Sequence, residues 1–173
     1  MSDTRSSNNG SNGASSGSSK GSAPKKNRKP SLTEQRRNAR KLALQALYQW
    51  QVGGQQANEI EAQFRVNNDM NEADVQLFSQ LLRGVINEKA ELDVTFSPFL
   101  DRNIDDLDPV EVNVLRIGSF ELLRRMEVPY RVAINESVEL AKVFGATDSH
   151  RYVNGVLDKV AQKARKAEIA ARR

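Results

Sequence analysis

Four cations and a tyrosine in one short stretch are the residues of this chain best suited to binding a polyanion. They are Arg36, Arg37, Arg40, Lys41 and Tyr48. On a helix Arg37, Lys41 and Tyr48 share one face, because four and then seven residues separate them. Cations at one end of such a face pair with phosphates, and an aromatic ring at the other end stacks on an unpaired base. The pattern favours binding of RNA or single-stranded nucleic acid. The alternative is a solvated helix end with Tyr48 packed in the core.

A second candidate surface is the segment that runs from Asp148 to Gly155. Ser149 is predicted to cap the helix that follows, which leaves backbone N–H groups available to an anion. Arg151 and Tyr152 are predicted to point away from the apolar stripe of that helix. On the residues alone, a capped helix start that makes only internal hydrogen bonds is the favoured interpretation here.

Residues suited to catalysis are few. The chain has one histidine, His150, and no cysteine. It contains no phosphate-binding loop with Lys-Ser or Lys-Thr and no Gly-x-Ser-x-Gly turn. The aspartates between positions 101 and 108 do not have the spacing of a calcium loop, so a solvated connection ending in a helix cap is expected there. We therefore expect no enzyme, no metal site and no cofactor.

Charge is distributed very unevenly along the chain. Residues 1–41 hold ten basic and two acidic side chains, and residues 159–173 hold six basic and one acidic. The intervening residues 42–158 hold ten basic and nineteen acidic side chains. Basic ends around an acidic middle suggest one surface for a polyanion and another for a different partner. Nucleic acid is the commonest polyanionic partner.

The composition divides the chain into a tail and one domain. Residues 1–31 contain ten serines and four glycines and almost no large apolar side chain, so we expect a disordered basic tail. Residues 32–170 are long enough to bury a core and are expected to form one helical RNA-binding domain. No apolar run is long enough for a signal peptide core or a membrane span, and the lack of cysteine fits a reducing cytoplasm.

Apolar residues recur at spacings of three and four through the domain, and no hairpin signal appears. Helices are expected from about 31 to 53, around 60–64, near 72–88, around 92–100, from 109 to about 126, from 129 to 144, and from about 149 onward. The fifth of these is apolar on most sides, so it is predicted to be central. The expected fold class is all-α, a compact bundle of about seven helices.

Four stretches of the chain resemble the NusB transcription antitermination family. They are RRNAR with ALQALYQW (36–50), VLRI with EL (114–122), VPYRVAINE with AKVFG (128–145) and DSHRYVNGVLD (148–158). The resemblance covers about residues 34–165 in order and without large gaps. The Ser/Gly-rich extension departs from the family, whose members usually begin close to the basic helix. Position 152 is Tyr where the family often has Phe, a change that should preserve stacking.

The resemblance implies an all-helical protein without catalytic activity. Such proteins bind the boxA element of nascent ribosomal-operon RNA as a heterodimer with a small-subunit ribosomal protein, called NusE in its transcription role. With other Nus factors, this complex makes RNA polymerase ignore terminators.

The resemblance also implies where the partners bind. RNA contacts are expected from Arg36, Arg37, Arg40 and Tyr48, with Asp148 and Tyr152 at or beside the same surface. The acidic middle of the chain would face the basic ribosomal protein, with Glu111 and Arg102 as its expected contacts.

Three alternatives keep the fold and change the role. The module is similar to the N-terminal RNA-binding domain of a small-subunit rRNA cytosine methyltransferase, which needs a second, larger domain with a cofactor site. It could act in maturation of ribosomal RNA. Some family members also form homodimers through the surface that otherwise holds the ribosomal protein, so a homodimeric interaction module is the third alternative.

Overall fold

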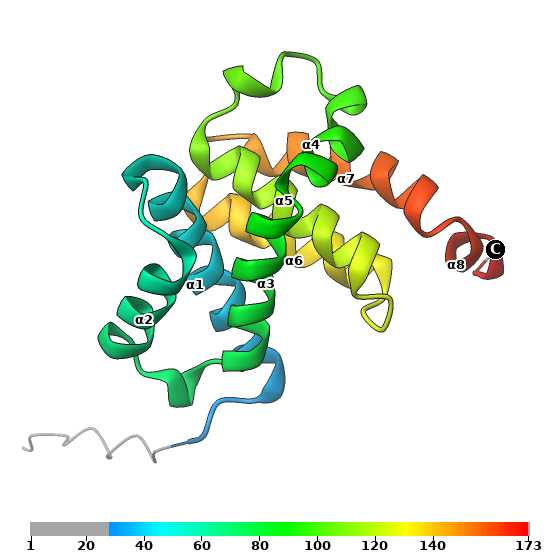
Figure 1. Cartoon of the computed structure of the whole chain (residues 1–173). Helices are drawn as coiled ribbons and strands as arrows, with labels where there is room; N and C mark the ends of the chain where they lie inside the picture. The colour runs from blue at the N-terminus through cyan, green and yellow to red at the C-terminus, as the bar shows by residue number, and fades with distance from the viewer. Residues whose placement is uncertain (1–27, 173) are drawn as a thin grey trace, which may run out of the picture.

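A computed structural model describes residues 28–172, which form eight α-helices and three short 3₁₀ turns without a strand (Figure 1). The helices are α1 (Leu32–Gly53), α2 (Ala57–Asn67), α3 (Val75–Asn87), α4 (Lys89–Phe96), α5 (Pro109–Arg124), α6 (Tyr130–Phe144), α7 (Ser149–Ala164) and α8 (Lys166–Ala171). The predicted all-α bundle is thus confirmed, with one helix more than expected. Most of the predicted tail, residues 1–27, lies outside the described residues. No helix of residues 28–172 is long and apolar enough to cross a membrane.

Local side-chain chemistry determines where α1 begins and ends. The Ser31 hydroxyl accepts from the Glu34 N–H, and the Glu34 carboxylate accepts from the Ser31 N–H, which together form a capping box. At the other end Gly54 has a φ of 70°, the left-handed conformation that ends a helix and favours glycine. These two ends place the basic residues in the first turns of a 22-residue helix.

Helix α5 lies in the centre of the bundle. Asp108 accepts a hydrogen bond from the Glu111 N–H, and Pro109 occupies the first turn, as the sequence predicted. The helix packs against α1, α3, α4, α6 and α7 (Figure 1). Every residue from Glu111 to Leu122 is buried. A helix enclosed in this way can fix the positions of several surface elements at once.

Gly118 on α5 and Gly155 on α7 differ in how closely other side chains approach them. A Cβ at Gly118 would lie 2.5 Å from Leu157 Cδ1 and 2.7 Å from Ser137 Oγ, and both side chains are buried. Gly118→Ala should therefore lower the free energy of unfolding by about 1–2 kcal/mol, because overpacking outweighs the gain in helix propensity. A Cβ at Gly155 on α7 meets open space, so Gly155→Ala should raise the free energy of unfolding by roughly 0.5–1 kcal/mol. Urea denaturation of both variants checks these opposite signs, and a stabilising Gly118→Ala would contradict the close packing of α5 on α7.

The start and end of α7 differ from prediction. Asp148 precedes the helix with a φ of 68°, and its side chain makes no capping bond. Ser149 is instead buried, and its hydroxyl donates to Glu111 Oε2 at 2.6 Å, so the predicted Ser149 cap was wrong. At the far end the chain turns at Arg165 into the short α8, which the apolar spacing alone did not separate from α7.

Candidate nucleic-acid interface

The exposed face of α1 carries the predicted cations and the predicted aromatic. Arg37 and Lys41 are exposed on this face, and Tyr48 retains 44% of its accessible surface. Arg36 is also exposed, but it lines a separate hollow with Arg125 and Val128. Tyr48 is therefore not packed in the core, which was the alternative. Gln45 lies between Lys41 and Tyr48 on the same face, at a spacing of four and three residues. The face is polar and cationic at its start and aromatic at its end.

Two shallow hollows border this face where α1 meets α6. One, of about 180 Å³, lies beside Arg37 and Lys41 and is also lined by Glu136, Glu139 and Val143, among others. The other, of about 220 Å³, is mostly apolar and is lined by Leu44, Gln45, Tyr48, Val110 and Phe144. A cationic hollow next to an apolar aromatic one matches the two parts of a nucleotide, the phosphate and the base.

Helical spacing did not identify all the residues at this site. Gln45 could have been found, since it follows Lys41 by four residues. Val110 and Phe144 come from α5 and α6, and no pattern within α1 could have indicated them.

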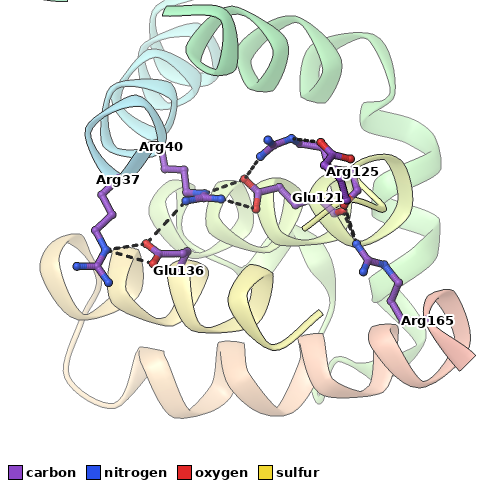
Figure 2. A network of polar contacts seen from close by, with 7 residues as sticks. Arg37, Arg40, Glu121, Arg125, Glu136 and Arg165 are labelled. Carbon is purple, nitrogen blue, oxygen red and sulfur yellow. Dashed lines mark hydrogen bonds and ion pairs between the residues drawn. The ribbon is translucent and has the colours of Figure 1, made fainter. Parts of the chain in front are cut away.

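Arg40 differs from the other cations because it is buried. Its side chain is 5% exposed, and its Nε donates to Glu121 Oε1 at 2.8 Å. Glu136 on α6 lies 3.9 Å from Arg40 and 3.2 Å from Arg37, so one carboxylate joins the buried and the exposed guanidinium (Figure 2). Glu136 is buried, and its carboxylate faces these two guanidinium groups and not the solvent. The Arg40 guanidinium is therefore bound by carboxylates inside the protein and is not exposed for contact with a ligand.

The ion pairs continue from the surface into the interior (Figure 2). Beyond Arg40, Glu121 also contacts Arg125 at 3.5 Å, and its main-chain carbonyl accepts from Arg165 at 3.1 Å. The network thus joins α1, α5, α6 and α7. Because Arg37 is held by a carboxylate that is itself anchored to Arg40, its guanidinium is positioned at the surface instead of moving freely.

The second candidate surface lies at the start of α7. The Tyr152 hydroxyl accepts a hydrogen bond from the Asp101 N–H at 3.3 Å, and the Arg102 guanidinium lies 4.9 Å from the centre of the Tyr152 ring. Arg102 also pairs with the Asp101 carboxylate at 2.9 Å. The hydrogen bond and the ion pair that Arg102 forms with the Asp101 carboxylate raise the pKa of Arg102. The pKa of Asp101 is lowered by the same contact with Arg102 and by Tyr152. Asp148 is exposed one turn before Tyr152.

The two expected partner contacts have different environments. Arg102 is about half exposed, whereas Glu111 is only 8% exposed and accepts the Ser149 hydroxyl. Glu111 therefore connects the start of α5 to the start of α7. Its neighbour Val110 lines the hollow beside Tyr48. The start of α5 thus lies between the two candidate surfaces and links them.

Fold and surface together define an all-helical module with a cationic and aromatic face of the kind that binds nucleic acid. The sequence model of the NusB family matches residues 37–162. The transcription antitermination protein NusB of Pseudomonas fluorescens (strain Pf0-1) is 57% identical over 143 residues, covering 83% of this chain and 86% of that protein. The same protein of Hahella chejuensis is 57% identical over 138 residues, covering 80% and 93%. The chain belongs to the NusB family.

Solved structures agree with this assignment. NusB of T. maritima superposes with a TM-score of 0.65 at 28% identity and covers 73% of this chain and 90% of that one. A chain from the crystal structure of antitermination factors NusB and NusE in complex with dsRNA superposes with a TM-score of 0.65 at 26% identity, covering 73% and 95%. The predicted family and fold are both confirmed.

Proposed function

We propose that this protein binds boxA RNA of ribosomal operons as a heterodimer with the small-subunit ribosomal protein NusE. With other Nus factors, the complex helps RNA polymerase read through terminators. The protein acts in the cytoplasm as an adaptor and performs no catalysis. This role rests on the family and on the relative whose structure is described with NusE and RNA.

The observation that carries the proposal is the exposed face of α1. Arg36, Arg37 and Lys41 supply phosphate contacts, and their affinity falls with rising salt because the counterions they release from the RNA then gain less free energy. Tyr48 supplies a ring on which a base stacks, beside an apolar hollow of base size. Arg40 acts on the RNA through Glu136 and Arg37 rather than by contact, since it is buried.

A partner protein extends this small surface. The acidic middle of the chain offers the complementary charge for a basic ribosomal protein, and Arg102 is the exposed one of its two predicted contacts. Glu111 holds the start of α7 through Ser149 and thereby positions the same region. Two RNA-binding proteins joined on one RNA reach higher affinity than either alone.

Titration of a boxA-like RNA with the protein, with and without the purified ribosomal protein, tests the proposal. At two salt concentrations we expect tighter binding in the presence of the partner and weaker binding at the higher salt. A scrambled RNA of the same length is the control. Equal affinity for both RNAs, with no effect of the partner, would sink the proposal and leave an interaction module of other function.

Tyr48→Ala should weaken RNA binding by about 5- to 150-fold, since loss of stacking on one base costs roughly 1–3 kcal/mol. Tyr48→Phe keeps the ring and should bind within about twofold of the wild type. Fluorescence anisotropy measures both affinities, and thermal melting confirms that this half-exposed position leaves the fold intact. If Phe and Ala weakened binding equally, the hydroxyl and not the ring would make the contact.

A further inference from the structure

The basic carboxyl-terminal part of the chain is not used by the site described so far. On α7, Tyr152, Gly155, Lys159 and Lys163 follow one another at spacings of three, four and four residues, so they lie on one face of the helix. That face is about 16 Å long at 1.5 Å per residue. Lys159 and Lys163 are exposed, and within residues 28–172 neither ammonium forms an ion pair with a carboxylate.

The segment before α5 lines the same face with a second cation and a second ring. Arg102 lies over the Tyr152 ring at 4.9 Å, and Lys163 Nζ lies 5.2 Å from the centre of the Phe99 ring. Cations held at aromatic rings sit at both ends of the face. We call Arg102, Tyr152, Lys159 and Lys163, together with Phe99, the α7 stripe.

Gly155 occupies the middle of the stripe. A Cβ there would meet no atom within 4 Å, so no packing within this chain requires a glycine. Glycine in a helix costs roughly 0.5–1 kcal/mol relative to alanine. A residue without a side chain lowers the surface between Tyr152 and Lys159 and lets a ligand approach the helix backbone.

The stripe is continuous with the α1 face. Tyr48 shares its hollow with Val110, the neighbour of Glu111, and Glu111 accepts the Ser149 hydroxyl at the start of α7. Tyr152 lies one turn beyond Ser149. A chain bound at Tyr48 that passes the start of α5 therefore arrives at the stripe.

Building on the proposed function, we propose that the α7 stripe binds the single-stranded RNA that flanks the segment held at Tyr48. Lys159 and Lys163 pair with two successive phosphates of that RNA. Alternating cations and rings are the composition of single-strand grooves. The unpaired positive charge of the stripe would attract either RNA or an acidic protein segment. RNA is favoured because the stripe continues the α1 face, which is the proposed RNA-binding surface.

The test compares two RNAs in the full chain with its partner protein. One is the short boxA-like RNA, and the other carries about six added uridines at either end, the length that a small single-strand site covers. Lys159→Gln/Lys163→Gln should bind the short RNA as the wild type does and bind the extended RNA more weakly. Two lost phosphate contacts reduce the slope of log affinity against log salt concentration by about 1.4 for the extended RNA. When the salt concentration is raised fourfold, the affinity of the variant for this RNA should therefore fall by a factor about sevenfold smaller than that of the wild type.

Lys89→Gln/Arg124→Gln is the matched control, because it removes the same charge from two cations already paired with carboxylates. An equal loss in the control would mean that only net charge matters, which overturns the stripe. Unchanged binding of the extended RNA by the Lys159→Gln/Lys163→Gln variant also overturns the proposal. That holds even if the variant binds an acidic protein more weakly than the wild type does. If the wild type binds neither RNA, it is the proposed function that fails.

Discussion

Arg165→Met should lower the free energy of unfolding by roughly 3–5 kcal/mol. The Arg165 side chain is fully buried. It donates to the main-chain carbonyls of Leu122 at 2.7 Å, Val128 at 2.8 Å, Arg125 at 2.9 Å and Glu121 at 3.1 Å. The last carbonyls of a helix have no partner within it, so this one guanidinium satisfies the end of α5. Methionine fills the volume but leaves the buried carbonyls of Leu122 and Val128 without this donor, whereas those of Glu121 and Arg125 keep a main-chain N–H partner.

Thermal melting measures the effect, and a loss of 3–5 kcal/mol corresponds to a fall in Tm on the order of 10 °C. Arg172→Met is the control, because Arg172 contacts the same Glu168, at 3.7 Å, but is about half exposed. Its loss should cost less than about 1 kcal/mol. Similar melting curves for the two variants would show that the carbonyl contacts of Arg165 add nothing to stability.

Arg40→Met should also lower the free energy of unfolding by about 3–5 kcal/mol, but for a different reason. Its removal leaves the buried carboxylate of Glu121, which is 1% exposed, without its closest cation. Because Arg40 also supports Glu136, the Arg37 guanidinium loses its fixed position, and RNA affinity should fall even at temperatures where the variant is folded.

The double variant Arg40→Met/Glu121→Gln separates these effects. It removes the unpaired charge, so it should recover a large part of the lost stability. It does not restore the link to Arg37, so RNA binding should stay weak. Recovery of both properties together would contradict the positioning role of Arg40. Full RNA affinity in a folded Arg40→Met variant would also contradict it.

Features determined by neighbours in the sequence could be predicted. Ser31 with Glu34, Asp108 with Pro109, and Gly54 each act within one helical turn, and the structure confirms the expected helix starts near 31 and 109 and the expected end near 53. The exposed face of α1 followed from the four-residue spacing of Arg37 and Lys41.

Features that depend on another helix could not be predicted. The spacing within α1 assigned Arg40 to the cationic group, but its burial depends on carboxylates that α5 and α6 supply. Arg165 looked like one more residue of a basic end, and only the packing of α7 against the end of α5 reveals its carbonyl contacts. Charge in a sequence does not distinguish a buried guanidinium from an exposed one.

Mapping of backbone amide chemical shifts on addition of a boxA-like RNA locates the bound RNA without altering the protein. We expect the largest shifts between Arg36 and Tyr48 on α1 and between Asp148 and Tyr152 at the start of α7. Small shifts are expected on α2, which packs beside α1 (Figure 1) but contributes no residue to the two hollows along the cationic face. Shifts concentrated on α2 and α3, with α1 unaffected, would show that the cationic face of α1 is not where this protein binds RNA.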